Sequence, residues 1–235
     1  MNDASATRLA GVFQGREPLV VLAPHPDDES LACGALLARG FAGAGAHVIC
    51  LTDGSASHPA SRQWPPDRLA ARRRAELSEA VSRLGGAKTD LTWLGLPDSR
   101  LHLADPMRVA EDLDRIVTGL GAAHVFVPAI EDHHADHKAT FRIALILRQR
   151  RPDLTFHAYP VWSRWDEPDF AAMIAARDPV FVPPGRMAGR KRAAIHAHRT
   201  QMGRIVRDDP FGFVLPDAMI RRFLDEDEIF WRMPA

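Results

Sequence analysis

The sequence predicts an α/β fold: a Rossmann-like, mostly parallel sheet with helices on both faces, followed by an irregular C-terminal layer. Two observations support this prediction. Short apolar runs alternate with longer segments of helical periodicity, which is typical of a parallel sheet covered by helices. In addition, no linker-like change of composition divides the 235 residues. We therefore expect one domain over residues 1–235, with residues 1–16 as a flexible N-terminal extension.

The strands are expected where apolar, β-branched runs end at polar or turn-forming residues. The first run, residues 18–23, stops at a turn rich in His and Asp, and the second leads into Gly54. By the same criterion, strands are expected at residues 18–23, 46–52, 90–94, 124–128 and 154–161.

The segments between these runs have the three- and four-residue spacing of amphipathic helices. In the clearest case Leu69, Leu77 and Leu84 share a face, and Gly85 follows as a stop signal. Prolines interrupt the pattern beyond residue 160, where only one helix, at residues 186–203, is expected. The other helices are expected at residues 29–42, 67–84, 106–119 and 137–150.

Composition argues against several functions. Thirty basic residues balance thirty acidic ones, so no net charge attracts the chain to nucleic acid or anionic lipid. The first residues do not resemble a signal peptide, and no apolar stretch reaches the roughly 18 residues that suggest a membrane span. The only two cysteines, Cys33 and Cys50, form no CxxC pair, which suits a reducing compartment. We therefore expect a cytoplasmic protein.

Reactive side chains directly follow two of the expected strands. The first motif, residues 25–29, reads His-Pro-Asp-Asp-Glu, and the second motif, residues 132–137, reads Asp-His-His-Ala-Asp-His. Because ligands of open α/β sheets bind beyond the carboxyl ends of the strands, both motifs are expected at one edge of the sheet. So many titratable groups are unfavourable to bury without partners. Together the two motifs therefore indicate a shared metal site.

Catalytic zinc takes three protein ligands and leaves one position for water. His25 and Asp28 lie three residues apart in a turn and can face one centre. The second motif supplies His134 and His137, which share a face, whereas His133 lies off that face. If one cation joins the two motifs, the rings of His25 and His137 should lie within about 6 Å of each other.

In order and spacing, the motifs resemble the LmbE-like superfamily, the PIG-L (N-acetylglucosaminyl-phosphatidylinositol de-N-acetylase) family of zinc-dependent N-deacetylases. Members of this family remove acetyl groups from molecules that contain N-acetylglucosamine. The resemblance spans about residues 18–140, and residues 198–201 weakly echo a C-terminal signature. It is carried by residues 23–29, by Thr52-Asp53-Gly54, by residues 94–98 and by the second motif.

The resemblance implies a role for most residues of the two motifs. His25, Asp28 and His137 would be the metal ligands. Asp27 would be the general base, His134 an imidazolium that polarises or protonates, and Asp136 the group that orients His134. The implied cofactor is Zn²⁺, and a set of two His and one Asp also accepts Fe²⁺.

The implied activity is hydrolysis by a zinc-activated water of an N-acetyl or N-acyl amide in a small amino sugar or glycoconjugate. Arg73 and Asp98 match family positions that approach the sugar, and His198 could reach the site from the last third of the chain. Trp64 could stack on a sugar ring. Long loops at such sites often pack against a neighbouring copy, so a homo-oligomer is an open alternative.

Other functions compete with this one. A nucleotide-binding Rossmann protein needs a GxGxxG turn after the first strand, where this chain has carboxylates. A serine hydrolase needs a GxSxG elbow, which the sequence lacks. A non-catalytic Rossmann-like binding module would leave both motifs without a purpose. Within the hydrolases, an amidase acting on a thiol conjugate or on another N-acylated metabolite or lipid remains the alternative.

Overall fold

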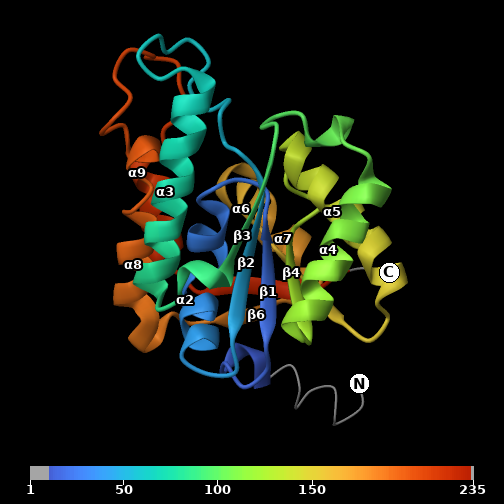
Figure 1. Ribbon diagram of the computed structural model, residues 1–235. Coiled ribbons are helices and arrows are strands. Elements are labelled where there is room, and N and C mark those ends of the chain that lie inside the picture. Colours follow the sequence, from blue (N-terminus) through green and yellow to red (C-terminus); the bar gives the residue numbers. More distant parts are fainter. Residues whose placement is uncertain (1–10, 234–235) are drawn as a thin grey trace.

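The computed structural model describes residues 11–233 and confirms the predicted fold class (Figure 1). The sheet has the order β3-β2-β1-β4-β5-β7-β6, in which the first five strands are parallel and the last two pairings are antiparallel. The strands are β1 (Leu19–Ala23), β2 (Ala46–Thr52), β3 (Leu91–Leu96), β4 (His124–Pro128), β5 (Thr155–Tyr159), β6 (Val180–Val182) and β7 (Glu228–Arg232).

Helices cover both faces of the sheet because the buried strands are apolar on both sides. In β1, Val21 belongs to one core and Val20 and Leu22 to the other, as the alternation of side chains along a strand requires. One face is covered by α2 (Asp28–Phe41), α3 (Pro66–Leu84), α8 (Ala188–Ile195) and α9 (Asp217–Asp225), and the other by α4 (Pro106–Leu120) and α5 (Ala135–Arg150).

The C-terminal layer is more regular than the sequence predicts. The expected helix at residues 186–203 is wrong in its extent, because α8 ends at Ile195 and a 3₁₀ turn, Arg199–Met202, closes at Gly203 with a φ of 63°. Two short helices, α6 (Trp162–Asp166) and α7 (Phe170–Ala175), precede it. Strands β6 and β7 and helix α9 were not expected.

Part of the expected N-terminal extension packs against the core. Residues 1–10 lie outside the described residues. Val12 is fully buried, and Phe13 stacks on Phe230 with ring centroids 5.4 Å apart. The expectation of a flexible extension is therefore wrong for these two residues.

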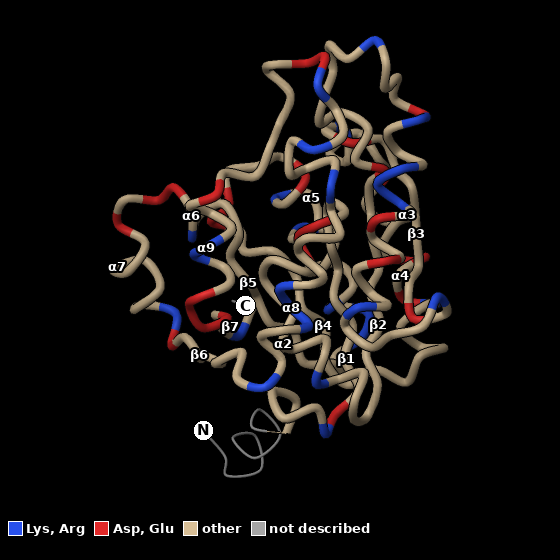
Figure 2. Tube along the Cα trace, turned by 90° about the vertical axis from the view of Figure 1, so that its left-hand side faces the viewer, with Lys and Arg blue, Asp and Glu red and all other residues tan. Residues whose placement is uncertain are grey.

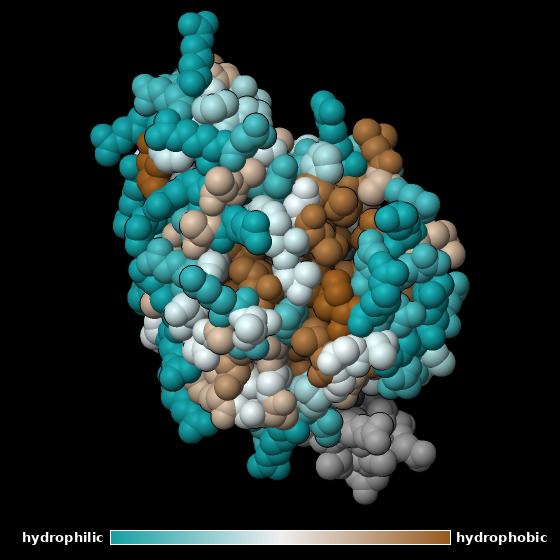
Figure 3. Space-filling view, viewed as in Figure 1, coloured by the Kyte–Doolittle hydropathy of each residue, from teal (hydrophilic) through white to brown (hydrophobic). Residues whose placement is uncertain are grey.

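The surface has no face of one charge along the described trace: Lys and Arg alternate with Asp and Glu over most elements (Figure 2). Hydrophobic residues gather on one face between α3 and α4 (Figure 3), where the half-buried edge strand β3 lies. Among the described residues, no helix has the length and apolar character required to cross a bilayer.

Candidate metal centre

The two motifs meet where the strand order reverses. β1 lies between β2 and β4, so the chain connections on its two sides run in opposite directions along the sheet. The first motif leads from β1 into α2, and the second leads from β4 into α5. This reversal opens a crevice at the carboxyl edge of the sheet, which is where open α/β folds bind ligands.

Three of the expected ligands converge on one point in this crevice. The Oδ2 atom of Asp28 lies 3.3 Å from Nδ1 of His25 and 3.3 Å from Nε2 of His137. The two imidazole centroids are 5.4 Å apart, within the limit set from the sequence. All three residues are buried, and their donor atoms lie within 4.8 Å of one another. This cluster of two His and one Asp is a candidate metal site.

The hydrogen bonding of His137 fits a cation at this point. Its Nε2 is buried and has no hydrogen-bond partner among residues 11–233. Its Nδ1 lies 2.8 Å from Oδ2 of Asp132, which is itself fixed by the backbone N–H (2.9 Å) and hydroxyl (2.6 Å) of Ser163. A carboxylate behind a ligating imidazole fixes its tautomer, so the Nε2 lone pair is left for a metal. No role was expected for Asp132 beyond its place at the start of the second motif.

The groups of the cluster perturb one another strongly. Burial disfavours a charged His137, but Asp28 and Asp132 raise the pKa of that imidazole to about 9. Burial likewise opposes a charged Asp28, but His137 and His25 hold the pKa of this carboxyl well below its usual range. The carboxylates of Asp28 and Asp132 therefore favour a positive charge at this point. Because a metal ion requires neutral imidazole, its affinity should rise with pH.

Asp27 lies beside this cluster in an unusual backbone conformation. Its φ of 155° and ψ of −27° are rare for a residue with a side chain, and such strain costs of order 1–3 kcal/mol. Arg73 donates to Oδ2 of Asp27 (3.1 Å) and to the carbonyl of Pro26 (2.9 Å). Burial raises the pKa of Asp27 to about 6, although Arg73 acts in the opposite direction. A carboxyl with this pKa is a stronger base than a solvated one.

His134 forms the N-cap of α5. Its Nδ1 accepts a hydrogen bond from the backbone N–H of Asp136 (3.2 Å), so Nε2 carries the proton of the neutral ring. Burial, together with His25 and His137, lowers the pKa of His134 to about 4. The structure thus favours a neutral imidazole at this position, whereas the family resemblance implied an imidazolium.

The carboxylate of Asp136 has different partners from those expected. It accepts from the backbone N–H groups of Ser99 (2.7 Å) and Leu101 (3.1 Å) and lies 3.3 Å from Nε2 of His25. The contact between Asp136 and His134 is made by the backbone N–H of Asp136, and the carboxylate takes no part in it. The sequence could not indicate this, because no local pattern places residues 99–101 against the first turn of α5. With His25 and His134, Asp136 forms a second cluster of donor atoms within 4.8 Å.

Two of the four expected substrate contacts line the cavity above the cluster, namely Arg73 and Asp98. The side chain of Arg73 is largely committed to the first motif. Asp98 accepts from the backbone N–H of Ala56 (2.9 Å), and its other oxygen lies 3.3 Å from Nε2 of His25. Burial alone would raise the pKa of Asp98, but His25 holds the pKa of this carboxyl well below its usual range.

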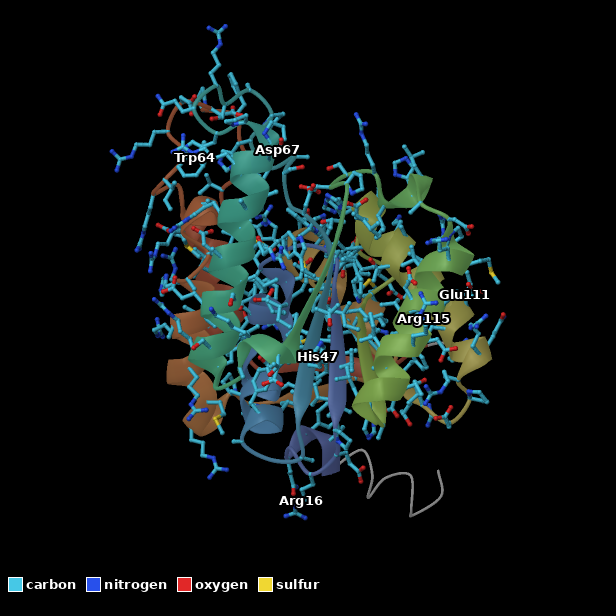
Figure 4. The ribbon with its side chains drawn as sticks, in the orientation of Figure 1. Arg16, His47, Trp64, Asp67, Glu111 and Arg115 are labelled. Carbon is cyan, nitrogen blue, oxygen red and sulfur yellow. The ribbon has the colours of Figure 1, made fainter. Side chains whose placement is uncertain are left out.

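The other two expected contacts lie elsewhere. His198 is only 1% exposed, and its Nε2 lies 3.0 Å from Oε1 of Glu29, behind the first motif. It is not among the residues that line the cavity, so its expected contact with substrate is wrong. Trp64 lies in the loop before α3, far from the ends of the central strands (Figure 4), and Arg68 stacks over its ring at 4.1 Å.

The cavity has a volume of about 340 Å³ and two unlike walls. The parallel half of the chain provides most of the polar wall, and the C-terminal layer provides much of the apolar one. The apolar residues carried no signal in the sequence, whereas Gln201 lay in the weak C-terminal signature. The polar wall includes His25, Asp27, Asp28, Ser57, Arg73, Asp98, Ser99, His134 and Gln201, and the apolar wall includes Leu31, Val161, Trp162, Phe213, Leu215 and Met219.

Fold and site together define an α/β protein with a candidate metal centre at the switch point of its sheet. The family described as PIG-L, GlcNAc-PI de-N-acetylase, matches residues 20–148, which include both motifs. The chain belongs to this family.

Curated relatives carry the names of deacetylases. The 1D-myo-inositol 2-acetamido-2-deoxy-α-D-glucopyranoside deacetylase of Kineococcus radiotolerans is 32% identical over 163 residues, which are 66% of this chain and 42% of that protein. The enzyme named deacetylase 2 for the same compound in Saccharopolyspora erythraea is 32% identical over 174 residues, which are 68% of this chain and 57% of that protein. The chain thus spans about half the length of these relatives.

Solved structures share the fold over nearly the whole chain. The N,N'-diacetylchitobiose deacetylase of Pyrococcus horikoshii superposes with a TM-score of 0.69 at 20% identity, covering 100% of this chain and 94% of that one. The zinc-inhibited form of the teicoplanin deacetylase Orf2 gives a TM-score of 0.62 at 21% identity, covering 91% and 97%. At these identities the likeness establishes the fold.

Proposed function

We propose that the protein is a zinc-dependent N-deacetylase that hydrolyses the N-acetyl or N-acyl amide of an amino-sugar substrate. One observation carries the proposal: Asp27, with its raised pKa, stands beside the convergent donor atoms of His25, Asp28 and His137 in an open cavity. The names of the relatives support the reaction class.

His25, Asp28 and His137 would hold the metal ion, and the same donor set would accept Fe²⁺. Zinc, when bound in such a site, polarises the amide carbonyl and lowers the pKa of a bound water to about 7. The remaining chemistry falls to side chains of the chain itself.

Asp27 takes the proton from the attacking water. An ordinary Asp, with a pKa of about 3.9, would make transfer from a group of pKa about 7 unfavourable by roughly 4 kcal/mol. Burial raises the pKa of Asp27 above that of an ordinary Asp, so the transfer is less unfavourable here. Once protonated, Asp27 can pass the proton to the leaving nitrogen as the C–N bond breaks.

His134 contributes as a neutral hydrogen-bond donor. Because its Nδ1 is occupied by a backbone N–H, the Nε2–H group can donate to the carbonyl oxygen as that atom gains negative charge. Asp136 then acts by fixing His134 and the loop at residues 99–101, and it holds no proton in the reaction.

The walls of the cavity suit an acylated amino sugar. Asp98, Ser99 and Gln201 offer partners for sugar hydroxyl groups, and Trp162 offers an aromatic face. The substrate class follows from this mixture of polar and apolar groups, with the substrates named for the relatives as the first compounds to test.

We also propose that the described residues act as one catalytic domain in a reducing compartment such as the cytoplasm. All the groups of the site come from one continuous sheet and its covering layers. Cys33 and Cys50 are buried free thiols, as a reducing environment would leave them. Assembly into a homo-oligomer stays a prediction.

The test is release of free amine by protein that has been stripped of metal and reloaded with Zn²⁺ or Fe²⁺. The substrates are N-acetylglucosaminyl-inositol and N,N'-diacetylchitobiose. We expect one metal ion per chain and amine release only from the loaded protein. If the loaded protein is inert towards these and other N-acylated amino sugars, the proposal is wrong.

A further inference from the structure

We propose that Glu29 and His198 are positioning residues that hold Asp27 in its working orientation from behind. This inference rests on the proposed function, in which Asp27 takes the proton from water. Neither Glu29 nor His198 lines the cavity, so any effect of theirs on the reaction is indirect.

The two side chains form an enclosed pair. Glu29 is 0% exposed and His198 is 1% exposed, and Oε1 of Glu29 lies 3.0 Å from Nε2 of His198. The hydroxyl of Ser30 donates to the same oxygen of Glu29. A buried carboxylate requires partners of this kind, since burial without them is strongly unfavourable. The C-terminal layer therefore supplies the partner for a residue of the first motif.

The second oxygen of Glu29 connects this pair to Asp27. Oε2 accepts a hydrogen bond from the backbone N–H of Asp27 at 3.0 Å. A rotation of φ at Asp27 towards an ordinary negative value changes where its side chain lies relative to this N–H group. With the N–H held by Glu29 and the carboxylate held by Arg73, the strained φ of 155° is retained.

A second buried pair of the same design provides a matched control. Lys191 and Glu228 are fully buried, with Nζ and Oε1 2.9 Å apart, and they also join the C-terminal layer to α2. Glu228 accepts from the backbone N–H groups of Ala35 (2.7 Å) and Leu36 (2.9 Å). Within residues 11–233 it makes no hydrogen bond to the first motif, so it shares the burial of Glu29 and lacks its link to Asp27.

The experiment compares Glu29→Gln, His198→Gln and Glu228→Gln in the metal-loaded enzyme. A carboxamide has one acceptor oxygen, so in Glu29→Gln it cannot accept from both Asp27 and His198. We expect all three variants to lose thermal stability and to keep one metal ion per chain. Glu29→Gln and His198→Gln should lower kcat about 10–100-fold with KM within about twofold, since a small misplacement of a catalytic group has effects of this size. Glu228→Gln should leave kcat within about twofold of wild type.

Crystal structures of the variants give a readout that does not depend on activity. We expect φ of Asp27 to relax out of its unusual region in Glu29→Gln and to stay near 155° in Glu228→Gln. Wild-type kcat in Glu29→Gln and His198→Gln, or an unchanged Asp27 in Glu29→Gln, would overturn the inference. If Glu29→Gln does not fold, His198→Gln decides by kcat. An inert wild type would refute the proposed function instead, and the φ of Asp27 would still decide the positioning role.

Discussion

The parallel half of the chain, residues 19–159, and the C-terminal layer, residues 160–233, build the candidate centre in different ways. The parallel half supplies every described member of the two candidate metal clusters, from turns that directly follow β1 and β4. The layer supplies apolar wall residues, such as Phe213 and Met219, and buried partners such as His198 and Lys191. The candidate reactive groups thus lie at the strand ends, whereas the layer adds much of the apolar wall and the buried partner behind the first motif.

The largest effect should come from the parallel half. Asp27→Asn removes the group that takes the proton, and we expect kcat to fall about 10³-fold, within the range for loss of a general base. Metal content, measured by elemental analysis, should stay at one ion per chain because Asp27 is not among the convergent ligands. Loss of metal together with activity would make Asp27 a ligand and would revise the site.

A smaller effect is expected on metal affinity when Asp132, the partner of the candidate ligand His137, is replaced. Asp132→Asn weakens the hydrogen bond that orients His137, so metal affinity should fall about 10–100-fold in a competition titration with a chelator. At saturating metal the kcat should recover most of its wild-type value. An unchanged affinity would mean that Asp132 only joins Val161 and Ser163 to the end of β4.

The junction of the two regions, where β5 pairs with β7, should make the stability of the protein depend on pH. Burial lowers the pKa of His157, on β5 beside β7, to about 3. Folding therefore favours the neutral form of His157. Its contribution to the free energy of unfolding is complete above the ordinary pKa of 6.5 and is lost as the pH falls towards 3. Between pH 7 and pH 5 the loss should be about 2 kcal/mol.

In His157→Phe this part of the acid sensitivity should disappear, as measured by urea unfolding of the two metal-free proteins at both pH values. Phe is a suitable replacement because His157 already stacks on Phe126 at 4.6 Å. The variant loses a contact with His124 at either pH, so the test is the change with pH and not the absolute stability. Equal pH dependence in the two proteins would place the acid sensitivity elsewhere.

The smallest effect should come from the apolar wall. Phe213→Ala removes a ring that contacts Trp162 at 5.4 Å, and an aromatic contact of this kind contributes about 0.5–1.5 kcal/mol. We expect KM to rise about two- to tenfold with little change in kcat. Phe181→Ala is the control, because Phe181 is on β6 and is not among the cavity residues. A fall in kcat alone would move Phe213 from substrate binding to catalysis.

The same contrast explains what the sequence could reveal. In the parallel half each strand is a local apolar run, and its reactive residues follow within a few positions, so the two motifs were identifiable together. Their shared location follows from the geometry of parallel sheets. The choice of His137 over His134 as a ligand came from the family resemblance. Helix and strand limits in this half differ from the predictions by only a few residues.

The layer lacked such local signals. Strand β7 begins with Glu228, whose burial depends on Lys191, 37 residues earlier in the chain. The partners of Asp136 and the packing of His198 behind Glu29 likewise depend on contacts between distant segments. Short-range periodicity in the sequence does not predict these contacts.

The ligands at Asp28 and His137 are separated by about a hundred residues, which form β2, β3, α3 and α4. A cation bound by both would therefore be a reversible cross-link between the turns after β1 and β4, and closing so long a loop removes many conformations from the unfolded chain. An ion at a hundred times its Kd would add about 2.7 kcal/mol to the free energy of unfolding. The lifetime of the protein in the cell, as well as its turnover of substrate, would then follow the supply of metal.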